Sequence, residues 1–163
     1  PDYELPYLNR GNAYRDLGRP EEAISDYGEA LNLNPNSASA LNNRGNIHRE
    51  RGNLELALTD FSRAIEIAPT FAFAFNNRGR TYREQGQLQL AIADYTEAIR
   101  LDPAYVVTYN NRGIAYLEDG QVTRSVADYD EAIRLDPKFV EAFMGRGIAM
   151  LRLDGIQLAH SDF

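Results

Sequence analysis

The most constraining feature of this sequence is a short stretch that recurs at one fixed interval along the chain. The copy at 110–116 reads Asn-Asn-Arg-Gly-Ile-Ala-Tyr, and similar copies stand at 76–82, 42–48 and 8–14, with a degraded one at 144–150. A chain that repeats in this way folds as a row of like units, each burying its apolar face against the next. Function is therefore expected on the surface that the row creates.

Proline and glycine punctuate every repeat. A proline disfavours helix in the residue before it, and a glycine just past a helix end supplies a left-handed turn. The prolines are Pro35, Pro69, Pro103 and Pro137, and the glycines are Gly18, Gly52, Gly86 and Gly120. We therefore predict a pair of helices in each repeat, with one array over 1–163. The repeats are about 4–37, 38–71, 72–105, 106–139 and a truncated fifth at 140–163.

Both helices of a repeat carry an apolar stripe. In the second helix of the first repeat, Ala23, Ile24, Tyr27 and Ala30 recur at helical spacing. The first helices carry an internal glycine, as at Gly113, although glycine there costs about 0.5–1 kcal/mol relative to alanine. We expect that a neighbouring helix approaches closely at this glycine.

This order of large aromatic, glycine, tyrosine, alanine, aromatic, alanine and proline resembles the tetratricopeptide repeat from Glu4 to the end of the chain. The resemblance implies an all-α fold, a right-handed superhelical solenoid of antiparallel helix pairs. It also implies a concave groove, lined by the first helices, that binds a peptide segment of a partner protein. The periodicity alone predicts only stacked helical hairpins.

Composition excludes several classes of function. The net charge of −7 argues against nucleic acid, because phosphate binding needs a basic face. There is no cysteine, and no apolar run is long enough to span a membrane. His48 and His160 lack partners at metal-ligand or nucleophile spacing, and there is no glycine-rich phosphate loop. We expect no enzyme activity, no cofactor and no metal. His48 replaces a tyrosine of the packing stripe and is expected in the core.

An arginine precedes the glycine of every first helix, where the family usually has an apolar residue. An aspartate stands at a matching place in every repeat, before the aromatic of the second helix. A planar guanidinium matches a carboxylate, so we predict structural ion pairs within the repeats. The predicted pairs are Arg10 with Asp26, Arg44 with Asp60, Arg78 with Asp94, Arg112 with Asp128, and Arg146 with Asp162. The alternative is a row of arginines that binds a ligand.

An asparagine ladder occupies another face of the first helices. Its members are Asn9, Asn43, Asn77 and Asn111, beside Asn42, Asn76 and Asn110. An amide both donates and accepts hydrogen bonds, so it suits the backbone of an extended peptide. In tetratricopeptide proteins the matching residues point into the groove. The alternative is that these amides order the contacts between repeats.

Arginine and further asparagine side chains are predicted beside the ladder in the first three repeats. Together with the ladder they form the predicted peptide-binding set, to which they add Asn12, Arg15, Asn46, Arg49, Arg80 and Arg83. Such a set would bind a partner carboxylate, so an acidic segment is one expected ligand. Four acids lie nearby and partly cancel this charge: Asp16, Glu50, Glu84 and Glu118. The alternative is a solvated face of mixed charge.

Some family members clamp a carboxylate terminus with two asparagines and several basic residues. Asn12 and Asn43 resemble the two asparagines, but Leu8, Phe73 and Asn77 stand where the basic residues would match. The resemblance therefore gives an incomplete clamp. We expect instead an extended peptide with apolar anchors, for which the groove offers Leu5, Leu8, Phe73, Val107, Ile114 and Leu117.

Three hypotheses follow for function. The leading one is a protein–protein interaction module that holds an extended or short helical segment of a partner. The second is a scaffold that self-associates into a homo-oligomer, through its ends or through the aromatics Phe71, Phe73 and Phe75. The third is a substrate-recruiting arm of a larger enzyme, since we expect a fragment of a longer protein or a chain whose last repeat is cut short. The compartment is undetermined, with cytoplasm favoured slightly over periplasm.

Overall fold

The computed structural model describes the backbone of residues 3–161 and the side chains as far as Asp154. The part of the chain so described contains helices and turns and no strand. The helices are α1 (Glu4–Asp16), α2 (Pro20–Leu33), α3 (Ala38–Glu50), α4 (Leu54–Ile67), α5 (Ala72–Glu84), α6 (Leu88–Leu101), α7 (Val106–Glu118), α8 (Val122–Leu135) and α9 (Val140–Ser161). The all-α fold expected from the repeat is therefore confirmed.

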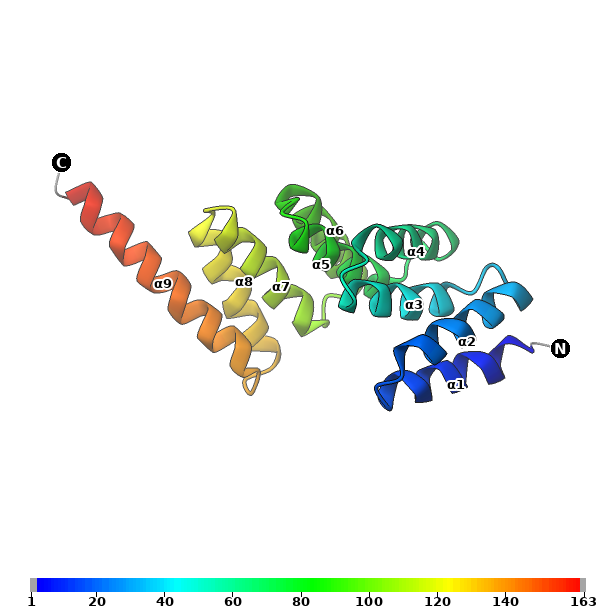
Figure 1. The fold of residues 1–163 in the computed structure, drawn as a ribbon. Coiled ribbons are helices and arrows are strands. Elements are labelled where there is room, and N and C mark those ends of the chain that lie inside the picture. Colours follow the sequence, from blue (N-terminus) through cyan, green and yellow to red (C-terminus); the bar gives the residue numbers. More distant parts are fainter. Residues whose placement is uncertain (1–2, 162–163) are drawn as a thin grey trace. The chain divides into compact units, whose positions relative to one another are not determined.

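The chain forms two compact units, residues 1–81 and residues 82–163, and the division falls within α5. In the first unit α1 packs antiparallel on α2, α3 packs on α4, and α2 joins the two hairpins through α3 (Figure 1). In the second unit α7 contacts α6 and α8, and α9 packs on α8 and α7. Each unit is thus a stack of helical hairpins.

Glycine closes each hairpin in a left-handed conformation. The φ angles of Gly18, Gly52, Gly86 and Gly120 are 68°, 77°, 75° and 78°. In the first turn the amide of Arg19 donates to the carbonyl of Tyr14 at 2.8 Å, a bond that satisfies one of the last carbonyls of α1. A residue with a Cβ is strained at such φ values, so the turn requires glycine.

Helix α9 differs from the first helices of the earlier repeats. It runs without a break from Val140 to Ser161, through the place where those repeats turn. Asp154 occupies the position in the fifth repeat that Gly120 occupies in the fourth, so the residue that would adopt the left-handed turn is absent there. None of the helices within the described residues has the length and apolar character needed to span a bilayer.

In the hairpins α1–α2, α3–α4 and α7–α8, an aromatic ring of the second helix packs on the backbone of the first helix. Tyr27 and Phe61 are fully buried. A Cβ built on Gly11 would lie 2.7 Å from Cε1 of Tyr27, and one on Gly45 would lie 2.8 Å from Cε1 of Phe61. The predicted close approach at this glycine is therefore confirmed, and the approaching group is the aromatic ring of the second helix.

Adding a methyl group to this glycine should destabilise the first unit. We expect Gly45→Ala to lower the free energy of unfolding by about 1–3 kcal/mol, because the added methyl group would overlap the fully buried ring of Phe61. Gly28→Ala is the matched control. Because α2 has open space at that position, alanine there should raise the free energy of unfolding by about 0.5–1 kcal/mol. Urea unfolding followed by circular dichroism measures both. A Gly45→Ala protein as stable as the parent would contradict this packing.

Candidate functional site

Arginine forks join the two helices of a repeat. Arg10 donates from Nε and Nη2 to the two carboxylate oxygens of Asp26, both at 2.7 Å. Arg112 donates likewise to Asp128, both at 2.8 Å. In the second repeat the corresponding distances, from Arg44 to Asp60, are 2.8 and 2.7 Å. These arginines therefore hold the two helices of a hairpin together, and the Nε and Nη2 donors of each guanidinium are already used in bonds to aspartate.

Arg112 also contacts aromatic rings and the preceding repeat. The guanidinium of Arg112 lies 5.9 and 5.7 Å from the ring centroids of Tyr109 and Tyr116, a cation–π arrangement. Its remaining Nη1 donates to Oγ1 of Thr96, in the preceding repeat, at 3.1 Å. One arginine thus links three helices, α6, α7 and α8.

Two of the predicted ion pairs, those of Arg78 and Arg146, are not confirmed in the way the other three are. Arg78 lies in the first unit and Asp94 in the second, so their pairing stays a prediction. Asp162 lies outside the described residues, and Arg146 donates Nη1 to Asp130 Oδ1, in the preceding repeat, at 2.7 Å. Arg78 likewise donates to a residue of the preceding repeat, Ser62, at 3.3 Å.

Burial distinguishes the ion pairs from one another. The side chain of Arg10 is 58% exposed, whereas that of Arg112 is 16% exposed. Burial raises the pKa of Asp128 above its usual range, although the hydrogen bonds from Arg112 act in the opposite direction. The arginine of the fourth repeat is therefore better shielded from solvent than the arginine of the first.

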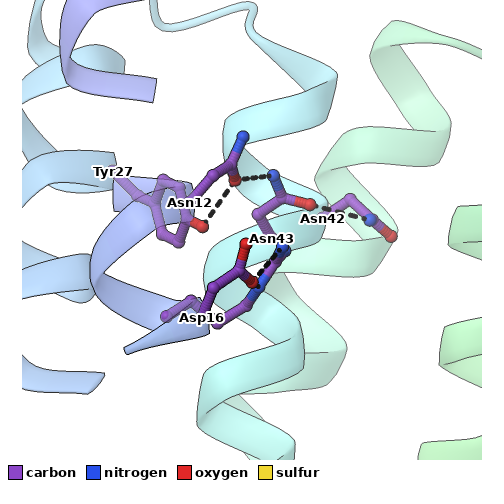
Figure 2. Close-up of polar contacts among 6 residues, drawn as sticks. Asn12, Asp16, Tyr27, Asn42 and Asn43 are labelled. Carbon is purple, nitrogen blue, oxygen red and sulfur yellow. Dashed lines mark hydrogen bonds and ion pairs between the residues drawn. The ribbon is translucent and has the colours of Figure 1, made fainter. Parts of the chain in front are cut away.

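Figure 2 shows a chain of side-chain amides that links α1 to α3. Tyr27 donates its hydroxyl to Oδ1 of Asn12 at 2.8 Å, and Asn43 donates Nδ2 to the same oxygen at 2.9 Å. Asn43 Oδ1 accepts in turn from Asn42 Nδ2 at 3.4 Å. Both lone pairs of the Asn12 oxygen are used, so only its Nδ2 protons can serve a ligand.

The amide chain continues from α3 to α5. Asn77 donates Nδ2 to Oδ1 of Asn42 at 3.0 Å, and Asn76 donates to Asn77 Oδ1 at 3.4 Å. Every amide from Asn76 to Asn43 donates toward α1, so the bonds polarise one another in one direction. The ladder residues Asn43 and Asn77 therefore connect consecutive repeats, as the alternative interpretation of the ladder expected.

The remaining members of the predicted peptide-binding set lie in different surroundings. Asn9 is exposed on α1, whereas Asn111 is buried in α7 with 9% of its surface accessible. Asn46 is half-buried on α3, and Arg80 is half-buried on α5. The set predicted from the sequence is thus divided between internal amides and a few accessible ones.

The arginines beside the ladder stand next to carboxylates. Arg15 pairs with Asp16 at 2.9 Å, and Arg83 pairs with Glu118 at 3.0 Å. Arg49 has only 9% of its side chain exposed and lies 3.7 Å from a Glu50 oxygen. The positive charge of this face is therefore largely neutralised within the protein.

The second unit contains a cavity of about 430 Å³ between α7 and α9. Its lining is mostly apolar and includes Ile114, Leu117, Met144 and Ile148, with Tyr129 of α8 also in the wall. The other lining residues are Asn110, Glu118, Glu141, Gly145 and Arg152. An apolar cavity with a few polar groups is the usual form of a ligand-binding pocket.

One residue of this cavity's lining has an unsatisfied polar atom. Asn110 is 7% exposed, and its Oδ1 is buried without a hydrogen-bond donor among the described residues. In the second repeat the equivalent oxygen of Asn42 accepts from Asn77. The residue equivalent to Asn77 in the fifth repeat is Gly145, which has no side chain to donate.

Sequence reasoning named part of this cavity, Ile114 and Leu117, as apolar anchors of the groove, but it missed the contribution of α9. The signal was present when the repeats are aligned: Met144 and Gly145 replace the two asparagines, and Ile148 stands where Asn12 and Asn46 stand in the first repeats. The described residues contain no cluster of three histidines, carboxylates or cysteines that could hold a metal ion.

The fold and these faces define a class of protein built from stacked helical hairpins, with rows of amide and arginine side chains on its first helices. Tetratricopeptide-repeat models match residues 8–70 and 61–93, and a TPR-repeat model matches 79–120 and 115–154. These matches together span residues 8–154. The chain belongs to the tetratricopeptide-repeat family.

Solved structures of this family resemble the chain along most of its length. A crystal structure of MamA is 25% identical with a TM-score of 0.79, and covers 90% of this chain and 80% of its own. YrrB, described as a TPR protein with an unusual peptide-binding site, is 20% identical with a TM-score of 0.76, covering 94% and 79%. The first TPR of Spaghetti (RPAP3), bound to the HSP90 peptide SRMEEVD, is 22% identical with a TM-score of 0.70, covering 72% and 93%. The comparison with curated proteins finds no match.

Replacing an amide by leucine should have different effects in the two units. Asn42→Leu removes the acceptor of Asn77 and leaves a buried donor unpaired, so we expect a loss of about 1–3 kcal/mol of unfolding free energy. Asn110→Leu removes an oxygen that accepts no bond, and leucine is the natural residue at the equivalent Leu8, so the loss should be smaller. Urea unfolding of both variants measures the difference. Equal losses would contradict a stabilising role for the amide chain of the first unit.

His48 replaces the tyrosine found at Tyr14, Tyr82 and Tyr116, and it is half-buried on α3. Its Nδ1 is buried without a hydrogen-bond partner among the described residues. Burial lowers the pKa of His48, as do Arg44 and Arg51, while Asp60 acts in the opposite direction. The folded protein therefore favours the neutral imidazole.

This shift predicts a dependence of stability on pH. Because the pKa is lower in the folded protein than in the unfolded chain, stability should fall as the pH drops below about 6.5, the unfolded value. His48→Tyr should remove this part of the dependence. Thermal unfolding of both proteins on either side of that pH, near neutrality and in mild acid, measures it. An equal drop in melting temperature for the two proteins would show that other groups cause the dependence.

Proposed function

We propose that this chain is a protein-interaction module that holds a segment of a partner protein against its first helices. The observation that carries the proposal is the cavity between α7 and α9, which is apolar, open to a ligand and edged by a few polar groups. Tetratricopeptide-repeat proteins are typically interaction modules without enzyme activity of their own. The peptide-binding descriptions of YrrB and of the RPAP3 domain agree with this proposal.

On the first unit, we assign partner contacts to Asn12, Arg15 and Asn46. Asn12 retains its Nδ2 protons, Asn46 is half-buried on the next first helix, and the amide chain beneath them fixes α1 relative to α3. Asn43 and Asn77 have a supporting role, because their amides bond between repeats. An acidic partner is not required, since Arg15 already has a carboxylate neighbour.

Capture experiments test this function. We expect the immobilised chain to retain specific proteins from an extract of its source cells, and Ile148→Glu to weaken the affinity of a retained partner at least about tenfold by placing a charge in the cavity. The double variant Arg15→Ala with Asn46→Ala should weaken it less. Leu90→Glu is the matched control, because Leu90 is comparably exposed on α6 but is absent from the cavity.

The measurements are mass spectrometry of the retained proteins and titration calorimetry with the purified partner. Circular dichroism shows that each variant keeps its helices. A partner that binds the parent, Ile148→Glu and the double variant with one affinity would contradict the proposed surface.

Self-association is a second candidate function, and the surface of α9 favours it. Val140, Met144, Ile148 and Leu151 are exposed by 61%, 60%, 52% and 75%. Exposed apolar side chains that are grouped on one helix mark an interaction surface. Light scattering over a range of concentrations decides between the two functions: a mass that stays monomeric counts against assembly.

A further inference from the structure

The cavity of the second unit is formed where the amide ladder of the sequence loses a member. Asn110 Oδ1 lacks the donor that Asn77 supplies to Asn42, because position 145 is glycine. A side chain at this position is excluded by Tyr129, whose Cζ would lie 2.5 Å from a Cβ on Gly145. The missing donor therefore cannot come from this residue. A ligand in the cavity, whose lining includes Asn110, can supply it when the buried amide oxygen turns toward the cavity.

The walls of the cavity require that the same ligand be largely apolar. Ile114, Leu117, Met144 and Ile148 line it on α7 and α9, and the volume of about 430 Å³ admits one large side chain. Met144 adapts to planar rings, because its thioether is flexible and makes favourable contacts with aromatic groups.

The charged groups at the cavity leave little net charge to select a cation or an anion. Glu118 is paired with Arg83 at 3.0 Å, and Arg152 donates Nη1 to the carbonyl of Leu117 at 3.2 Å. Glu141 is exposed and is balanced in sign by Arg152. A neutral ligand is therefore favoured over a charged one.

We propose that this cavity binds a tryptophan side chain presented by the partner segment, with the indole N–H donating to Asn110 Oδ1. Tryptophan is the large apolar side chain that carries a donor and no acceptor, so it satisfies the lone oxygen without burying another unpaired acceptor. Phenylalanine offers no donor, and tyrosine brings an oxygen of its own. The biological role of this site rests on the proposed interaction function, whereas its chemistry does not.

Small probes test the site in the complete chain. N-acetyl-L-tryptophanamide, its 1-methylindole derivative, N-acetyl-L-phenylalaninamide and N-acetyl-L-argininamide are titrated while the methyl signals of Ile114, Met144 and Ile148 are followed by NMR. We expect saturable shifts of these methyl groups, with the tryptophan probe binding about tenfold more tightly than its methylated form, which lacks the N–H. The chain contains no tryptophan, so indole fluorescence gives an independent readout.

Equal affinities for the tryptophan probe and its 1-methyl derivative would overturn the proposal. Tighter binding of the arginine probe, or shifts confined to methyl groups outside the cavity, would overturn it as well.

Two variants locate the interaction within the cavity. Asn110→Leu should abolish the preference for the N–H probe over the methylated probe, and Ile148→Glu should weaken both. Leu90→Glu should leave both affinities unchanged, because Leu90 is not part of the cavity. A preference for the N–H probe that survives in Asn110→Leu would contradict the assigned hydrogen bond. If that variant did not fold, the comparison of probes in the parent protein would still decide.

The two proposals fail in different ways. A chain that binds the tryptophan probe but retains no partner from the extract would keep the site and lose the interaction function. If a partner is captured but the tryptophan probe neither binds the chain nor changes the affinity of that partner, the interaction function stands and the tryptophan site is contradicted.

Discussion

The contact on which the structure depends is an aromatic ring packed directly on helix backbone at glycine. It sets the distance between the two helices of a hairpin, because any Cβ on Gly11 or Gly45 would overlap the ring of Tyr27 or Phe61. Tyr129 makes this contact twice, since a Cβ on Gly113 would lie 2.9 Å from it and one on Gly145 would lie 2.5 Å from it. The ring that builds the fourth hairpin therefore also shapes the cavity.

Polar groups complete the stacking in two ways. Arginine forks join the helices of a repeat, and the amide chain joins one repeat to the next in the first unit. Groups bonded in this manner are unavailable to a ligand, because breaking a buried hydrogen bond leaves an unpaired donor or acceptor. We therefore expect a ligand to use polar groups that are not hydrogen-bonded in the stacking of the helices, such as the Nδ2 protons of Asn12 and the Oδ1 of Asn110.

The helices and their turns could be predicted from the sequence because they depend on local rules. The turn glycines have the left-handed φ that their spacing indicates, and the helices end before the prolines. The partner of Arg10 and of Arg112 could also be predicted, since the same two residue types recur at one separation in each repeat. The hydrogen-bond partners of Asn43 and Asn77 could not be predicted, because an amide can bond equally well to a neighbouring helix and to a peptide.

The sequence by itself determined that the chain is a row of helical hairpins, since a constant repeat period with fixed glycines and prolines leaves one way to bury each apolar stripe. Only the tertiary structure decided which amides are engaged and where a cavity forms. Those outcomes depend on distances between side chains of different repeats, such as Asn77 to Asn42. At position 145 the ladder has glycine in place of asparagine. This glycine changes the surroundings of Asn110, a residue of the preceding repeat, and both residues line the cavity.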